Sequence, residues 1–280
     1  MKKASLPLVW LSILVSVAAM AQPAPQRLAV LSPHSVEMVY AVGAGERIIA
    51  TVEYADFPES AKQIPRVGSY NAINLEALLA FEPDLVLLSY QDTNALILEQ
   101  IKGLGLPVED TSVSKIDGVA TRLRELGQRL GVAEKASQAA DDFEAKLAKV
   151  RQQYQGRAEV KVFYQIWPAP LTTVSDGWMS QVIADCGGIN VFNDNPASYP
   201  QVSQEQVILT MPEVILKPHY HGAAKEAGLD WNRWPEIPAV KRNQQHFING
   251  DLVHRTGPRL VDGMEEVCEA IDAARQAKAH

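Results

Sequence analysis

Two stretches of the chain, 129 positions apart, carry the same pattern and decide the fold. The first, residues 69–88, reads SYNAINLEALLAFEPDLVLL, and the second, residues 198–217, reads SYPQVSQEQVILTMPEVILK. In each, a residue that favours helix N-caps, Asn74 or Ser203, comes two positions before a glutamate, Glu76 or Glu205. A proline and an acid then end the helix before a short apolar run. The repeat predicts two homologous α/β lobes.

Short apolar runs elsewhere extend this pattern over the chain. They are too short for surface helices and are typical of parallel strands that are buried on both faces. Strands are expected at residues 27–32, 48–52, 85–89, 160–167, 214–217 and 246–248. A closing helix is expected over residues 260–277.

The middle of the chain separates the two sets of strands. Residues 134–155 contain no Gly or Pro and are rich in Ala, Lys, Glu and Gln, which favours one long helix that stops at Gly156. The fold class predicted is therefore α/β, with two Rossmann-like lobes joined by a single long helix. The expected boundaries are residues 22–131 for the N-terminal lobe, 132–155 for the linker helix and 156–280 for the C-terminal lobe.

The first 21 residues differ in composition from the rest. Lys2 and Lys3 precede an apolar stretch over residues 6–20, and Ala19-Met20-Ala21 fits the small-x-small pattern of a cleavage site. An uncleaved membrane anchor is the alternative, but the stretch is shorter than the roughly 18 residues of a spanning helix. Residues 1–21 are therefore predicted to be a secretory signal peptide, so that the mature protein is exported and soluble.

Composition and motifs exclude several functional classes. The 280 residues carry a net charge of −7, which argues against a nucleic-acid partner. The phosphate-loop, Gly-x-Gly-x-x-Gly, Gly-x-Ser-x-Gly and His-Glu-x-x-His motifs are all absent. His219 and His221 form a weak metal-ligand pattern that occurs more often in exposed loops. No catalytic residue, metal site or cofactor is predicted, although an exported enzyme on this scaffold stays as an alternative.

Cys186 and Cys268 are the only cysteines. Disulfides persist in oxidising compartments, so export favours a structural disulfide between them. A bridge over 82 positions stabilises a fold by about 4 kcal/mol in the chain-entropy model. A metal site or a catalytic thiol is the other reading, but neither cysteine has a histidine or another cysteine within a few residues.

Aromatic residues cluster near the predicted strand ends. In parallel α/β sheets, ligands bind outside the carboxyl ends of the strands, and aromatic side chains there provide flat apolar walls. Trp167 and Trp178 could instead belong to the core. A polar stretch, residues 251–259, follows the strand expected at 246–248 and is well placed to bind the polar rim of a ligand. The aromatic residues in question are Tyr54, Tyr70, Tyr90, Trp167, Trp178 and Tyr199.

Several motifs together resemble a known family. They are the signal peptide, the long middle helix and the segments 31–33 (LSP), 67–70 (VGSY), 74–76 (NLE), 83–86 (PDLV) and 200–203 (PQVS). The mature chain resembles, over nearly its whole length, the helical-hinge (class III) periplasmic binding proteins of ABC importers for vitamin B12, haem and ferric siderophores. The resemblance also implies a disulfide between Cys186 and Cys268.

The resemblance implies roles for individual residues. Tyr54 matches a tyrosine that contacts the corrin ring of vitamin B12, and Tyr70, Trp167 and Tyr199 match aromatic pocket residues. A second ligand-contacting segment comprises Asp251, Leu252, Val253, His254 and Arg255. This chain departs from the family pattern where Tyr70 and Tyr199 replace tryptophans and where residues 252–254 replace a bulkier, partly acidic trio. Glu76 and Glu205 match glutamates that dock onto the permease.

The function implied is capture of vitamin B12 (cobalamin) in the periplasm and its delivery to an inner-membrane ABC permease and its ATPase. Cobalamin is the transported ligand, not a cofactor, and the free protein is expected to be a monomer. Haem or a ferric siderophore is the alternative ligand. Haem-binding relatives use a tyrosine near the position of Tyr70 to bind iron, and Arg255 and Arg259 are the main candidates for binding an anionic siderophore.

Overall fold

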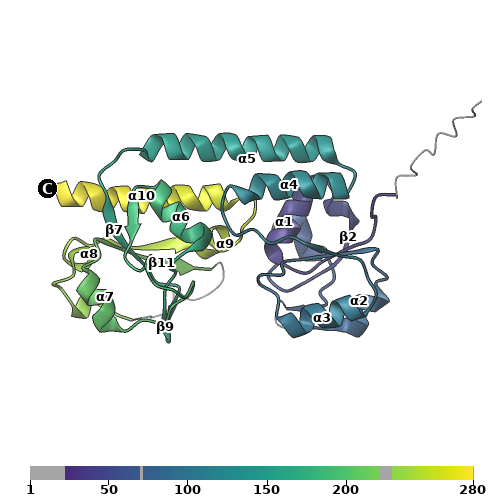
Figure 1. Cartoon of the computed structure of the whole chain (residues 1–280), viewed down its shortest axis with the longest axis horizontal. Helices are drawn as coiled ribbons and strands as arrows, with labels where there is room; N and C mark the ends of the chain where they lie inside the picture. The colour runs from purple at the N-terminus through teal and green to yellow at the C-terminus, as the bar shows by residue number, and fades with distance from the viewer. Residues whose placement is uncertain (1–22, 70–71, 221–228, 280) are drawn as a thin grey trace, which may run out of the picture.

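The computed structural model describes residues 23–69, 72–220 and 229–279. They form two α/β lobes, and one long helix, α5 (Ala133–Tyr154), runs along both of them (Figure 1). The predicted signal peptide, residues 1–21, lies outside the described residues. Within the described ranges, no helix combines the length and the apolar character that a membrane span requires.

The N-terminal lobe is built on a parallel sheet with the strand order β2-β1-β5-β6. Ala29 pairs with Ala50 on one side and with Val86 on the other, so β1 lies inside the sheet. The strands are β1 (Leu28–Val30), β2 (Ile48–Thr51), β5 (Leu85–Leu88) and β6 (Val108–Asp110). The helices are α1 (Pro33–Ala41), α2 (Leu75–Ala80), α3 (Ala95–Gly103) and α4 (Gly118–Arg129), with 3-10 turns η1 (Gly45–Arg47) and η2 (Glu59–Gln63) and a hairpin of β3 (Gly68–Ser69) and β4 (Ala72–Ile73).

The C-terminal lobe repeats this topology with the strand order β10-β7-β11-β12. Its strands are β7 (Val160–Tyr164), β10 (Gly188–Asn190), β11 (Val214–His219) and β12 (Gln245–Asn249). Its helices are α6 (Gly177–Asp185), α7 (Gln204–Thr210), α8 (Pro238–Lys241), α9 (Gly250–Val253) and α10 (Leu260–Ala279), with the turn η3 (Trp231–Arg233) and a hairpin of β8 (Trp167–Pro168) and β9 (Leu171–Thr172). The predicted α/β fold class is confirmed.

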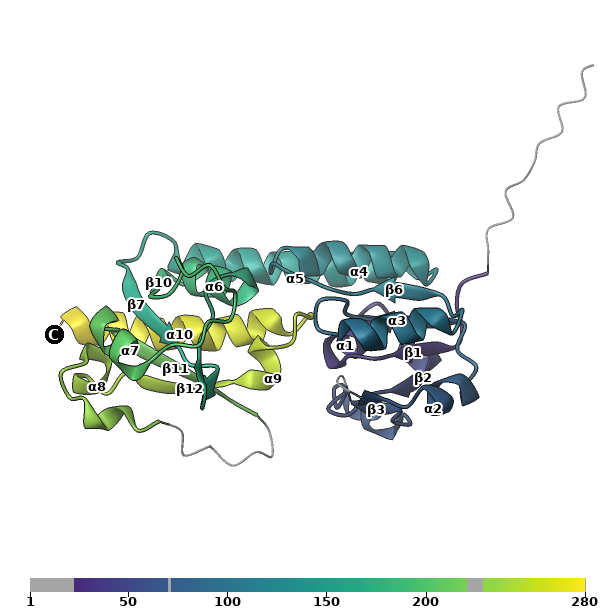
Figure 2. The ribbon, with the colours of Figure 1, turned by 60° about the horizontal axis from the view of Figure 1, so that its bottom comes forward.

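Helix α5 packs against the last helix of each lobe, α4 and α10 (Figure 2). Its buried residues recur every three or four positions, which places them on one face of the helix. They are Ala136, Ala140, Phe143, Leu147, Val150 and Tyr154. This face joins a hydrophobic core that includes Leu123 of α4 and Ile271 of α10. The helix expected over 134–155 is therefore present with bounds shifted by one residue, whereas the lobe boundaries stay a prediction.

The repeated pattern forms the same element in both lobes. The Asn74 side chain accepts a hydrogen bond from the backbone N–H of Ala77 (3.0 Å), and Ser203 accepts one from Gln206 (3.2 Å). Ser203 also forms a capping box, because the Gln206 side chain accepts from the Ser203 N–H at 2.8 Å. Both predicted N-caps are therefore confirmed.

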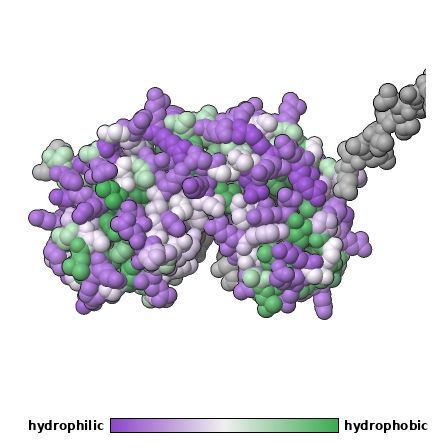
Figure 3. Space-filling model, in the orientation of Figure 1, coloured by the Kyte–Doolittle hydropathy of each residue, from purple (hydrophilic) through white to green (hydrophobic). Residues whose placement is uncertain are grey.

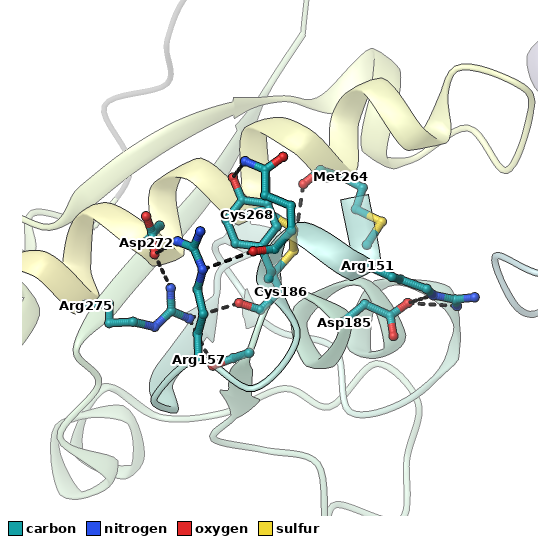
Figure 4. The surroundings of a disulfide bond; sticks show 11 residues. Arg151, Arg157, Asp185, Cys186, Met264, Cys268, Asp272 and Arg275 are labelled. Atoms are coloured by element: carbon teal, nitrogen blue, oxygen red, sulfur yellow. Dashed lines mark hydrogen bonds and ion pairs between the residues drawn. A yellow bond between two sulfur atoms is a disulfide. The ribbon is translucent and has the colours of Figure 1, made fainter. Parts of the chain in front are cut away.

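The disulfide between Cys186 and Cys268 is present (Figure 4). It joins the C-terminal end of α6 to the middle of α10, and the two Cα atoms are 4.8 Å apart. Both cysteines are fully buried. Arg275 of α10 donates a hydrogen bond to the Cys186 carbonyl oxygen at 3.0 Å, so the same junction also has a polar contact.

One strand prediction was wrong in extent. Residues 160–167 were expected to form one strand, but β7 ends at Tyr164 and Trp167 begins the separate hairpin strand β8. The Ile166 N–H bonds to the Thr172 carbonyl instead of continuing the ladder with β11. The chain thus leaves the sheet at its carboxyl edge, where it can contribute to a site.

Candidate ligand-binding cleft

The two lobes face each other across a cleft at the carboxyl ends of their strands. A cavity of about 530 Å³ lies between them. Figure 3 shows a notch between the two lobes. Each lobe contributes loops that follow its strands, as expected for parallel sheets. The cavity is lined by Gln91, Ser114 and Lys115 from the N-terminal lobe and by Asp176, Gly177, Gln181 and Ser198 from the C-terminal lobe.

Tyr54 follows β2 and is the most exposed of the predicted aromatic site residues that the structure describes. Its side chain is 69% exposed, and its backbone has φ +64°, in the left-handed region that non-glycine residues rarely adopt. The Tyr54 carbonyl accepts hydrogen bonds from the Asp56 N–H (3.0 Å) and from Arg255 of the other lobe (3.1 Å). The loop that carries Tyr54 is therefore held from across the cleft.

Trp167 and Tyr199 present aromatic surface from the C-terminal lobe. Their side chains are 50% and 52% exposed. Residues 198–200 run beside residues 173–175, with the Ser175 N–H donating to the Ser198 carbonyl at 3.0 Å, which fixes the segment that carries Tyr199. Burial, with Asp92 and Asp176 nearby, raises the pKa of Tyr199. Since Asp92 belongs to the N-terminal lobe, Tyr199 lies close to the facing wall. The fourth predicted aromatic residue, Tyr70, lies outside the described residues.

The segment 251–255 occupies the start of the connection between β12 and α10. Asp251, Leu252 and Val253 belong to the short helix α9. Asp251 and Leu252 are half-buried, but Val253 has no exposed surface and packs in the hydrophobic core. Arg255 is only 8% exposed. Asp251 and Leu252 are therefore partly accessible to a ligand, whereas Val253 and Arg255 lie mostly inside the protein.

His254 is held between two tyrosines. Its Nε2 lies 2.5 Å from the Tyr164 hydroxyl and its Nδ1 lies 2.6 Å from the Tyr220 hydroxyl. Burial lowers the pKa of His254 to about 4. The neutral imidazole can donate at one nitrogen and accept at the other, so both bonds are satisfied at once. Neither ring nitrogen is therefore free to bind a metal in a ligand.

Two further aromatic residues have structural roles. The Trp178 indole N–H donates to the Val253 carbonyl at 2.8 Å, and the ring packs against the core. This position agrees with the alternative that Trp178 is a core residue. Tyr90 is half-buried, with the Lys102 ammonium 5.0 Å from its ring centroid.

Sequence reasoning missed Glu37 and the ion pairs that it forms between the lobes. Glu37 of α1 is buried, yet it pairs with Arg255 and Arg259, which come from the opposite lobe. The separation of more than 200 positions left no local pattern to detect. The sequence did single out both arginines, but as groups for an anionic ligand.

The two repeated glutamates lie on the surface. Glu76 is in the first turn of α2 and Glu205 in the first turn of α7, and both are exposed. In Figure 1, α2 and α7 lie on the side of the molecule away from α5. Each lobe therefore presents one carboxylate in an equivalent position.

The histidine pair gives no metal site in the described part of the chain. His219 is half-buried and its Nδ1 has no hydrogen-bond partner, whereas His221 lies outside the described residues. Across residues 23–69, 72–220 and 229–279, no group of three or more His, Cys, Asp or Glu side chains is arranged to hold a metal ion.

Two α/β lobes with a cavity between them, joined by one long helix, are the architecture of a binding protein that takes its ligand between domains. The periplasmic binding protein family model matches residues 28–250, and the chain belongs to that family. The vitamin B12-binding protein of Vibrio campbellii is 35% identical over 270 residues, which cover 96% of this chain and 97% of that protein. The vitamin B12-binding protein of Pectobacterium carotovorum is 33% identical over 269 residues, covering 95% of each.

Solved structures agree with this assignment. The crystal structure of the periplasmic vitamin B12-binding protein of Vibrio cholerae has a TM-score of 0.83 and 32% identity, and the match covers 90% of this chain and 99% of that one. A periplasmic haem-binding protein of Roseiflexus matches with a TM-score of 0.78 at 23% identity, covering 89% and 99%. The second likeness concerns the fold alone.

Proposed function

We propose that this protein captures cobalamin in the periplasm and delivers it to an inner-membrane ABC permease with its ATPase. The observation that carries the proposal is the cavity between the lobes together with three exposed aromatic side chains, Tyr54 from the N-terminal lobe and Trp167 and Tyr199 from the C-terminal lobe. Aromatic side chains on both sides suit a large, planar, largely apolar ring system, and polar groups at the rim suit its amide side chains. The similarity to vitamin B12-binding proteins over the full chain supports the same ligand.

The direct test is calorimetric titration of the purified mature protein with cyanocobalamin. We expect stoichiometric binding, and we expect Tyr54→Ala and Trp167→Ala each to weaken it by about tenfold to a hundredfold, because each removes a large aromatic contact. Leu209→Ala is the matched control, since Leu209 is 82% exposed but lies just before the amino end of β11, away from the cleft. No heat with cyanocobalamin would refute the proposal.

Haem is the second ligand to titrate. Tyr70, the candidate iron ligand, lies outside the described residues, and both ring nitrogens of His254 are already bonded to tyrosine hydroxyls. We expect haemin to bind more weakly than cyanocobalamin. Strong haemin binding with a Soret shift, and none of cyanocobalamin, would replace the proposed ligand.

The delivery step is proposed to use Glu76 and Glu205. One exposed carboxylate on each lobe suits a dimeric permease that has one basic patch on each subunit, because complementary charges orient the two proteins. We expect Glu76→Ala with Glu205→Ala to leave cyanocobalamin binding unchanged and to abolish stimulation of the transporter ATPase in proteoliposomes. Glu134→Ala is the matched control, because Glu134 is also an exposed first-turn glutamate but belongs to α5. Normal stimulation by the double variant would reduce both residues to helix-capping groups.

A further inference from the structure

A buried ion-pair network joins the two lobes next to the cleft. Glu37, on α1 of the N-terminal lobe, is 3% exposed. Its Oε1 accepts hydrogen bonds from Arg255 Nη1 (3.1 Å) and Arg259 Nη2 (2.6 Å), and its Oε2 accepts one from Arg259 Nε at 2.9 Å. Both arginines belong to the C-terminal lobe. One buried carboxylate is therefore the meeting point of two guanidinium groups from across the interface.

Arg255 also holds the two segments that carry proposed ligand contacts. Its Nη1 donates to Asp56 (2.7 Å), and its Nη2 donates to the Tyr54 carbonyl (3.1 Å) and to Asp251 (2.9 Å). The four N–H groups on the two terminal nitrogens are thus all used within the protein. An arginine bonded in this way has little left to offer a ligand, but it fixes the positions of its four acceptors.

Arg259 holds the same loop through a ring contact. Its guanidinium carbon lies 3.8 Å from the ring centroid of Phe57, within the range of a cation–π interaction. Phe57 is three residues from Tyr54, whose left-handed backbone needs support from its surroundings. Both arginines that bind Glu37 therefore also hold the Tyr54–Phe57 loop.

We propose that Glu37 is a positioning residue for the corrinoid cleft, which acts through Arg255 and Arg259 to hold the Tyr54–Phe57 loop and Asp251 in place. This proposal rests on the proposed function. Without the Glu37 carboxylate, the guanidinium groups of Arg255 and Arg259 lose the acceptor that they share. Their positive charges then repel each other and the two groups move apart. The loop that carries Tyr54 then loses its fixed position relative to the C-terminal wall, so the cleft is less well formed before the ligand arrives.

The first test combines Glu37→Gln with Tyr54→Ala in a double-mutant cycle. Cyanocobalamin dissociation is followed by stopped-flow fluorescence, with melting temperature measured in parallel. We expect Glu37→Gln alone to raise the dissociation rate by about tenfold and to add less than about twofold in the Tyr54→Ala background, because the effect is carried by Tyr54. Glu144→Gln, which breaks the exposed pair with Arg124 between α4 and α5, is the control and should leave the rate unchanged. Additive effects, or a lower melting temperature with an unchanged rate, would overturn the proposal.

A second variant and a second readout keep the test independent of folding and of ligand identity. Asp56→Asn removes the negative charge of one acceptor of Arg255 on a partly exposed loop and should also raise the dissociation rate, by a smaller factor. Spin labels at Ser60→Cys, next to the Tyr54–Phe57 loop, and at Leu209→Cys, on the C-terminal lobe, measure the distribution of distances between the loop and that lobe without ligand. We expect Glu37→Gln to broaden this distribution and Glu144→Gln not to. An unchanged distance distribution in Glu37→Gln overturns the proposal, whether or not cyanocobalamin binds. Failure of cyanocobalamin to bind the wild-type protein is a different result, which refutes the proposed function.

Discussion

The two lobes share one topology but hold their last helix in different ways. Each has four parallel strands in equivalent order, yet only the C-terminal lobe has a covalent link, between α6 and α10. The corresponding helix of the N-terminal lobe, α4, continues into α5, and that lobe relies on Arg47, which donates to the Leu130 and Pro25 carbonyls at 2.7 and 3.1 Å. The comparison indicates that the disulfide restrains α10 covalently, whereas α4 is restrained by its short connection to α5.

Of the tests of this comparison, removal of the disulfide by Cys186→Ala with Cys268→Ala has the largest expected effect. We expect the C-terminal lobe to lose about 4 kcal/mol of unfolding free energy, because an 82-residue span is no longer closed in the unfolded chain. Urea denaturation can separate the lobes, since all four tryptophans that follow the predicted signal peptide lie in the C-terminal lobe. The fluorescence transition should move to lower urea, while the part of the circular dichroism change that comes from the N-terminal lobe stays in place. Equal shifts of both signals would mean that the lobes unfold as one unit.

The second test compares the buried histidines, one in each lobe. Burial lowers the pKa of His254 to about 4 from an unfolded value of 6.5, so below about pH 6.5 the unfolded chain takes up a proton that the folded chain refuses. The stability that His254 contributes is therefore complete above that pH and is lost as the pH falls toward 4, by about 3 kcal/mol at most. Burial also lowers the pKa of His34, but Asp92 and Glu37 oppose that effect.

The measurement is the unfolding free energy at several pH values between about pH 7 and about pH 4.5, from tryptophan fluorescence for His254→Gln and from circular dichroism for His34→Gln. We expect the pH dependence to be clearly flatter in His254→Gln than in the wild-type protein and only slightly flatter in His34→Gln. If His254→Gln leaves the pH dependence unchanged, the imidazole is not the group that resists protonation. The slope is compared, not the absolute stability, because either substitution also changes buried hydrogen bonds.

The smallest test compares the two helix caps. Ser203→Ala removes the hydroxyl half of a reciprocal capping box, whereas Asn74→Ala removes a single side-chain acceptor. Each should cost about 1 kcal/mol of unfolding free energy, with the larger value for Ser203. Urea denaturation monitored by circular dichroism gives both numbers. A larger loss from Asn74→Ala would show that the reciprocal bond from Gln206 adds nothing.

The elements that were predicted correctly are those that a local sequence pattern determines. The repeat located α2, β5, α7 and β11, and the long run without glycine or proline located α5 to within one residue at each end. It missed β6 and β10, because their three-residue sequences VED and GIN contain no apolar run. These edge strands depend on pairing with their neighbours, which is a tertiary effect.

The candidate site was predicted less completely than the fold. Position at a strand end selected Tyr54, Trp167 and Tyr199, which the structure leaves exposed. Their role in ligand binding stays a prediction. The same criterion also selected Trp178, whose indole turns inward to bond a backbone carbonyl. Glu37 could not be found, because nothing in a one-dimensional pattern relates it to arginines in the other lobe. The direction of a side chain and the contacts between the lobes depend on how the folded chain packs, so a local sequence pattern does not predict them.

If Glu76 and Glu205 dock onto a permease as proposed, helix α5 has a consequence for how that permease tells a loaded binding protein from an empty one. A continuous helix of 22 residues packed on both lobes offers no soft point about which they could swing, so we expect the outline of the protein to change little on occupancy. Small-angle scattering with and without cyanocobalamin should then give nearly the same radius of gyration. The empty protein would present Glu76 and Glu205 at almost the same spacing as the loaded one. It would therefore occupy the permease as a competitor, and uptake would depend on the ratio of loaded to empty protein as well as on the amount of vitamin.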